Sequence, residues 1–150
     1  MKPTGRRAPT AVLSDLIRTC EQAERSFRSS ARRLQDPMLG RLLESYAEQL
    51  GAFGQELRGE LGPLARVSDR TAEQPQSGEE RRSHKIPGLS RHEGTVIAQC
   101  ARREQALVRA YEMAVAWGLA GRAGAAVERQ HLQVKDAEEH LQTLAQAGLT

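Results

Sequence analysis

Aromatic residues are scarce in this chain, making up only 3% of its 150 residues. Because aromatic and β-branched residues favour strands, a chain with few of them is poorly suited to form a sheet. Ala, Leu, Arg, Glu and Gln dominate instead, and these residues favour helix. The composition therefore predicts an all-α protein, and the length is sufficient for one domain with a real core.

Long apolar runs are also missing. Lys2, Arg6 and Arg7 make the N-terminus basic, but polar residues interrupt every apolar stretch that follows. We therefore expect neither a signal peptide nor a membrane span, and we predict a cytoplasmic protein without a membrane partner. In that compartment the two cysteines, Cys20 and Cys100, are expected to be reduced thiols buried in the core.

Lysine is rare as well, since only three of the 22 basic residues are Lys and the other 19 are Arg. The net charge is only +3. Four pairs of adjacent arginines occur, at 6–7, 32–33, 81–82 and 102–103. No base-stacking aromatic residues are interleaved with them, which disfavours a nucleic-acid partner and favours a solvated surface.

A carboxylate interrupts the apolar face of a predicted helix at Glu104. Apolar residues recur there at spacings of three, four and seven, at Val96, Cys100, Leu107, Tyr111 and Ala114. Such spacing defines one face of an α-helix. Earlier in the chain Cys20 and Glu24 repeat the same Cys-x-x-x-Glu-x-x-apolar pattern. The repetition predicts a bundle made of two related halves.

Four helices are predicted within one domain, residues 10–146, after a disordered basic tail at residues 1–9. The first runs from 10 to about 35, and the second begins at Pro37 after Asp36 as N-cap and ends at Gly62-Pro63. Ser90 and Glu93 form a capping box that opens the third helix, which fades at Trp117-Gly118. The fourth follows a turn punctuated by glycines at 121 and 124.

Residues 64–89 show no sustained periodicity and are rich in Ser, Glu, Arg, Gln and Pro. A helix of about 25 residues spans ~37 Å, a distance that this segment could cover easily if extended. Long crossovers define one class of four-helix bundle. We therefore predict a crossover between the second and third helices and an up-down-down-up order. The alternative is a loose insert between neighbouring antiparallel helices.

The predicted interior contains an unusual set of polar groups: Glu24, Tyr46, Glu104, Tyr111 and Gln130, with Cys20 and Cys100 one turn away. Burying a lone carboxylate costs several kcal/mol or keeps it protonated. A metal, a Tyr hydroxyl, an Arg or a proton shared by the two carboxyls would compensate. A redox pair of the two cysteines is a further alternative, although buried apolar thiols are usually inert.

These features, taken together, resemble a known family. The matching positions are Leu16-Ile17, Cys20 with Glu24 and Phe27, Asp36-Pro37, Phe53 with Glu56-Leu57, Cys100 with Glu104, Ala110-Tyr111-Glu112, and Gln130 with Val134-Lys135. On them the chain resembles a bacterial ferritin-like family of four-helix-bundle proteins, a group defined by a domain of unknown function. The resemblance implies a ferritin-like fold and no established activity.

The resemblance also implies a metal centre, but an incomplete one. In ferritin-like carboxylate proteins two helices each give one Glu and the other two each give Glu-x-x-His. Glu24 and Glu104 resemble the first pair and are the predicted ligands of iron or manganese. In Glu128-x-x-His131, His131 is expected at the rim of the apolar face and Glu128 is expected to point roughly away from it, and the second helix has no His. The predicted outer ligands or substitutes are Tyr46, Tyr111, Gln130 and His131.

Two functions from different classes follow. The first is a ferritin-like bundle with a degenerate carboxylate centre, which the resemblance links to metal binding and stress response. The second is a non-enzymatic structural or interaction bundle, in which Tyr or Gln side chains satisfy the buried carboxylates and exposed helix faces mediate homo-oligomerisation. Metal content separates the two.

Overall fold

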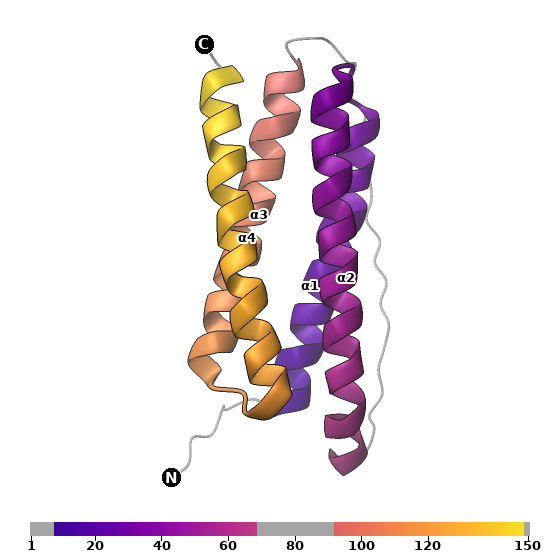
Figure 1. The fold of residues 1–150 in the computed structure, drawn as a ribbon, viewed down its shortest axis with the longest axis vertical. Helices are drawn as coiled ribbons and strands as arrows, with labels where there is room; N and C mark the ends of the chain where they lie inside the picture. The colour runs from indigo at the N-terminus through magenta and orange to yellow at the C-terminus, as the bar shows by residue number, and fades with distance from the viewer. Residues whose placement is uncertain (1–7, 69–91, 149–150) are drawn as a thin grey trace.

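The computed structural model describes residues 8–68 and 92–148, and there it contains four helices and no strand (Figure 1). They are α1 (Pro9–Arg32), α2 (Pro37–Ser68), α3 (His92–Trp117) and α4 (Gly121–Gly148). The predictions of an all-α protein and of a helical bundle are therefore confirmed. No helix among the described residues is both long enough and apolar enough to cross a membrane.

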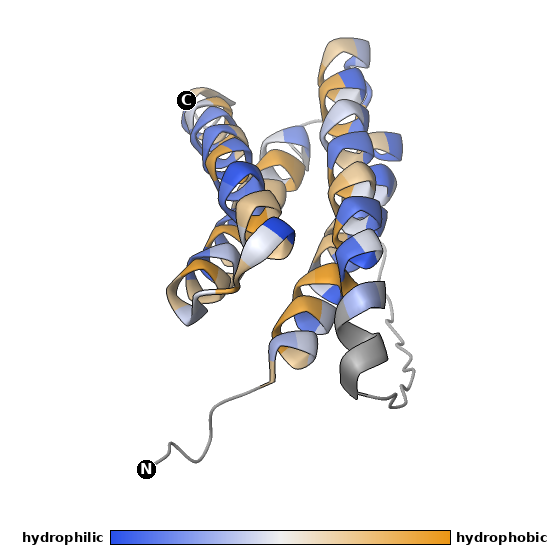
Figure 2. Cartoon of the chain, turned by 60° about the horizontal axis from the view of Figure 1, so that its bottom comes forward, coloured by the Kyte–Doolittle hydropathy of each residue, from blue (hydrophilic) through white to orange (hydrophobic). Residues whose placement is uncertain are grey.

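Each helix buries the face that its apolar spacing predicts. In α1 the buried apolar residues are Val12, Leu13, Leu16, Ile17, Cys20, Ala23, Phe27 and Ala31. Figure 2 shows hydrophobic and hydrophilic residues mixed along all four helices, as amphipathic helices require. At the start of α2, Asp36 acts as the predicted N-cap, because its Oδ1 accepts a hydrogen bond of 2.8 Å from the Met38 backbone N–H.

The helices form two hairpins that pack against each other. α1 pairs with α2 and α3 with α4, while α1 also packs on α3 and α2 on α4. All four of these neighbouring pairs are antiparallel, so α1 and α4 run in one direction and α2 and α3 in the other (Figure 1). As a result, the end of α2 and the beginning of α3 lie at opposite ends of the bundle.

The predicted end of the second helix at Gly62-Pro63 is wrong, because α2 continues through Pro63 to Ser68. Proline lacks the N–H that would bond the carbonyl of Gly59, four residues earlier. Both residues are exposed, so water can satisfy that carbonyl. Residues 64–68 of the predicted crossover therefore belong to α2, and the rest of it lies outside the described residues.

The last helix, α4, begins earlier than the glycines of the preceding turn predicted. The turn between α3 and α4 uses Gly118 and Gly121, whose φ angles of +86° and +67° favour glycine. Gly124, predicted to lie in this turn, is instead inside α4, where its N–H bonds the Ala120 carbonyl. A Cβ at Gly124 would lie 2.1 Å from the Leu119 carbonyl oxygen, so this position requires glycine for a close approach.

The N-terminal end of α3 is tied to the turn between α1 and α2. Oε2 of Glu93 accepts backbone hydrogen bonds from Gln35 (2.6 Å) and Asp36 (2.9 Å). The predicted capping partner Ser90 lies outside the described residues. The Glu93 carboxylate thus joins the two hairpins at one end of the bundle.

Candidate functional site

Glu104 is the only carboxyl side chain among the described residues that is fully buried. It is 1% exposed, and its Oε1 has no hydrogen-bond partner. Burial, with a smaller contribution from the nearby Glu138 carboxylate, raises its pKa from 4.5 to about 8. Glu104 is therefore mainly protonated at neutral pH, which is one of the alternatives that the sequence left open.

Glu24, its counterpart in α1, lies in a different environment. Its side chain is 27% exposed, and Oε2 accepts a hydrogen bond of 3.1 Å from Arg28 Nη2. The carboxylate covers Gly51 of α2, where a Cβ would lie 3.0 Å from Oε2. Glu24 thus occupies the edge of the α1–α2 contact, in space that a glycine leaves open, and is already paired with a cation.

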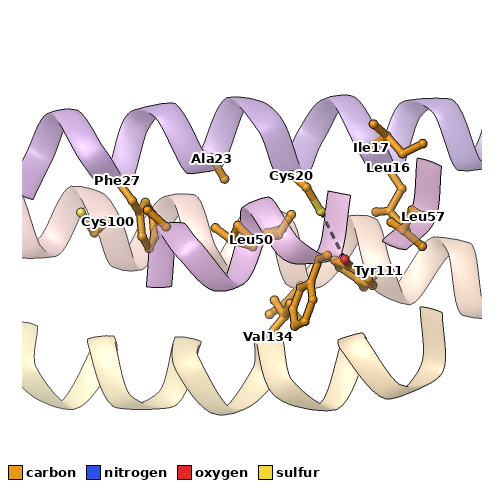
Figure 3. Packing of buried hydrophobic residues seen from close by; sticks show 14 of the residues in the cluster. Leu16, Ile17, Cys20, Ala23, Phe27, Leu50, Leu57, Cys100, Tyr111 and Val134 are labelled. Carbon is orange, nitrogen blue, oxygen red and sulfur yellow. Dashed lines mark hydrogen bonds between the residues drawn. The ribbon is translucent and has the colours of Figure 1, made fainter. Parts of the chain in front are cut away.

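A chain of hydrogen bonds crosses the bundle interior instead. The hydroxyl of Tyr111 donates to Gln130 Oε1 at 2.6 Å, and Gln130 Nε2 donates to Glu56 Oε1 at 2.8 Å. Arg129 Nη1 donates to the same Glu56 oxygen at 3.1 Å. Cys20 Sγ lies 3.2 Å from the Tyr111 hydroxyl (Figure 3). We call these five residues the interior network; they come from all four helices.

Charge in the interior network is confined to its outer end. Hydrogen bonding from Arg129 lowers the pKa of Glu56, and Gln130 adds to this effect. At the inner end, burial raises the pKa of the Tyr111 hydroxyl far above its ordinary value, so the hydroxyl remains a neutral donor. Glu56 was not predicted as a site residue, although its position between Phe53 and Leu57 in the α2 stripe was a signal.

Two other predicted site residues lie apart from the interior network. Tyr46 was predicted to be an interior polar group, but its hydroxyl lies 2.8 Å from Nδ1 of the exposed His140. Both line a polar groove of about 530 Å³ between α2 and α4, with Gln49, Gln133, Asp136, Ala137, Glu139 and Thr143. His131 is half-buried, and its Nε2 has no hydrogen-bond partner.

The two cysteines are free thiols with separate neighbours. Cys20 contacts Tyr111, whereas Cys100 hydrogen-bonds with Ser30, and Figure 3 shows them at different levels of the bundle. Burial raises the pKa of each thiol to about 11. They therefore do not meet as a redox pair, and neither forms a reactive thiolate at neutral pH.

The donor set does not fit the iron or manganese centre that the family resemblance implies. Within residues 8–68 and 92–148, no group of three or more His, Cys, Asp or Glu side chains is placed to hold a metal ion. Such a centre in ferritin-like proteins uses four Glu and two His. Here Glu24 pairs with Arg28, and Glu104 is protonated.

The chain matches no protein-family model and no curated protein. The resemblance to a ferritin-like family therefore stays a prediction.

Proposed function

We propose that this protein is a non-enzymatic helical bundle that serves as a binding scaffold, with the interior network in the place where a ferritin-like bundle holds its metal. The observation that carries the proposal is the mutual satisfaction of Tyr111, Gln130 and Glu56 by hydrogen bonds. Side chains that already satisfy each other, in a site that lacks a set of ligands, have a structural role.

The fold proposed for this scaffold is ferritin-like, with residues 69–91 as the crossover. Two observations support this topology. α2 and α3 run in the same direction, and the chain must pass from one end of the bundle to the other to connect them (Figure 1). Long connections of this kind distinguish ferritin-like bundles from up-down-up-down bundles with short loops.

A metal-linked, stress-related bundle is the second candidate, and one observation favours it. Glu104 Oε1 has no hydrogen-bond partner, and Glu138 is close enough to raise the pKa of Glu104. A cation between the two carboxylates would remove both penalties. Two carboxylates without a His are a weak ligand set for iron or manganese, so water would have to complete the coordination shell.

Elemental analysis separates the two candidates. Untagged protein would be purified, loaded anaerobically with iron(II) or manganese(II), desalted and analysed by mass spectrometry. We expect no metal near stoichiometry in the wild type, in Glu104→Gln or in the control Glu24→Gln. Stoichiometric metal in the wild type and in Glu24→Gln, lost in Glu104→Gln, would overturn the scaffold proposal in favour of a metal centre.

A further inference from the structure

A second groove lies between α1 and α3, on the face where these helices carry small and basic side chains. Its volume is about 470 Å³. The residues that line it are Ser26, Ser29, Ser30, Arg33, Gln99, Cys100, Arg102, Arg103 and Ala106. Cys100 hydrogen-bonds with Ser30, and Figure 3 shows it at a different level of the bundle from Cys20 and Tyr111, so the groove lies away from the Cys20–Tyr111 contact.

The groove is a direct result of helical spacing. On α1 its residues follow positions 26, 29, 30 and 33, and on α3 positions 99, 102, 103 and 106, so each helix contributes one continuous stripe. Serine and alanine are short, which leaves the surface between the two helices hollow. Arginine side chains are long and flexible enough to reach over such a hollow from its rim.

The charge of the groove is uncompensated. Arg33, Arg102 and Arg103 line it, and no acidic side chain does so among the described residues. Some of the other arginines of the bundle are paired with carboxylates, among them Arg28 with Glu24, Arg58 with Glu21, and Arg129 with Glu56. In the described part of the chain, none of the three groove arginines has an ion pair.

The field of two of these guanidinium groups reaches Cys100 in the groove. Burial raises the pKa of the Cys100 thiol and Glu104 adds to that rise, while Arg33 and Arg103 lower it. A concave surface lined by charges of one sign concentrates ions of the opposite sign. The groove is therefore suited to an anion.

We propose that the α1–α3 groove binds a small phosphorylated ligand, with its phosphate held by Arg33, Arg102 and Arg103. Guanidinium groups bind phosphate through paired, charge-assisted hydrogen bonds, and serine hydroxyls are suited to the remaining oxygens. Three cations match a dianionic phosphate better than a single carboxylate. The proposal does not depend on whether the interior binds metal.

The size and lining of the groove favour a small molecule over a nucleic acid. Its volume falls within the ~300–1,000 Å³ typical of small-molecule sites. Non-specific binding of single strands relies on aromatic side chains that stack on bases, and none lines this groove. A phosphorylated small molecule therefore accounts for both the basic charge and the lack of aromatic residues.

The test is calorimetric titration with inorganic pyrophosphate and with glycerol 3-phosphate at low ionic strength. The groove variant is the triple substitution Arg33→Gln, Arg102→Gln, Arg103→Gln. We expect saturable binding of at least one probe to the wild type and a loss of affinity of about tenfold or more in the variant. The probe that binds more tightly shows whether free polyphosphate or a phosphomonoester is the better ligand.

A charge-matched control distinguishes the groove from general basicity. The control triple is Arg25→Gln, Arg109→Gln, Arg122→Gln, which removes the same net charge from exposed positions outside the groove. We expect it to bind each probe within about twofold of the wild type. Equal weakening in both triples, or no saturable binding to the wild type at millimolar probe, would overturn the proposal.

Two further measurements complete the test. Ser29→Glu places a carboxylate in the groove from an exposed position and should abolish binding, with an unchanged circular-dichroism spectrum, even if the groove triple folds poorly. A single-stranded 12-mer oligonucleotide should bind more weakly than the better phosphate probe. Tighter binding of the oligonucleotide, with a steep salt dependence, would instead assign the groove to nucleic acid.

Discussion

Glu104 makes the stability of this bundle depend on pH in an unusual direction. Its pKa is about 8 in the folded state and near 4.5 when exposed, so between these values the folded state binds more protons than the unfolded state. This contribution to stability is therefore complete below about pH 4.5 and is lost as the pH rises to about 8. We expect Glu104→Gln to match the wild type near pH 5 and to exceed its free energy of unfolding by a few kcal/mol near pH 9. Urea unfolding at pH 5, 7 and 9 measures this difference.

Glu24→Gln is the matched control for that experiment. The Glu24–Arg28 pair is partly exposed, and such pairs contribute about 0–1 kcal/mol. The control should therefore follow the wild-type curve within that margin at all three pH values. A Glu104→Gln variant that is less stable than the wild type at pH 9 would contradict a protonated, unpaired Glu104 and would indicate a bound cation.

The two tyrosines provide a second matched pair at the scale of single residues. Tyr111→Phe removes the donor to Gln130 Oε1 inside the core, and leaving that acceptor unsatisfied should cost about 1–3 kcal/mol. Tyr46→Phe removes a contact with the exposed His140, which water can replace, and should cost less than about 1 kcal/mol. Chemical denaturation of both variants measures which one loses more free energy of unfolding. Equal losses would contradict a stabilising role for the interior network.

Helical spacing predicted that Glu24 and Glu104 are equivalent, and the structure shows why that inference fails. Spacing places both side chains in the arc of buried residues, but it does not reveal what faces them. Gly51 opposite Glu24 leaves room for the carboxylate to turn toward Arg28, whereas Glu104 is enclosed and near Glu138. Tyr111 and Gln130 were predicted to be interior polar groups, but their partners depend on the relative placement of the helices.

At the scale of secondary-structure elements, apolar spacing predicted the four helices and most of their buried residues because each stripe persists for several turns. Proline and glycine predicted the helix boundaries less well. Pro63 does not end α2, since Pro63 and Gly59 are both exposed. Gly124 lies inside α4 because only a glycine permits the close approach to the Leu119 carbonyl oxygen. Both outcomes depend on the local surroundings of a residue rather than on its type.

Two glycines in helices should respond to alanine in opposite ways. Gly124→Ala places a Cβ 2.1 Å from a backbone oxygen, and relieving this clash should cost about 1–3 kcal/mol. Gly59→Ala meets nothing within 4 Å at an exposed position of α2 and should stabilise the protein by about 0.5–1 kcal/mol. Thermal melts of both variants test this contrast, and a stabilising Gly124→Ala would show that the α3–α4 turn can shift.

At the scale of the whole molecule, polar contacts connect hairpins that otherwise meet through apolar side chains. Tyr111 and Gln130 belong to the α3–α4 hairpin, while Cys20 and Glu56 belong to the α1–α2 hairpin. Apolar surfaces can slide to alternative packings of similar energy, whereas hydrogen bonds require one alignment. We therefore infer that the interior network fixes the register of one hairpin against the other, a role known for some buried polar groups.

A double variant, Tyr111→Phe with Gln130→Met, separates register from stability. Tyr111→Phe alone leaves Gln130 Oε1 unsatisfied and should lower the free energy of unfolding by about 1–3 kcal/mol. Gln130→Met then removes that acceptor while conserving side-chain volume. The double variant should therefore regain most of the lost free energy. Glu56 loses one donor but keeps Arg129. Urea unfolding should therefore show a double variant more stable than Tyr111→Phe, while broader amide signals in its NMR spectrum would report several packings of the hairpins. If the two losses simply add and the spectrum stays sharp, the hydrogen bonds of Tyr111 and Gln130 contribute net stability and the remaining contacts between the hairpins set the register.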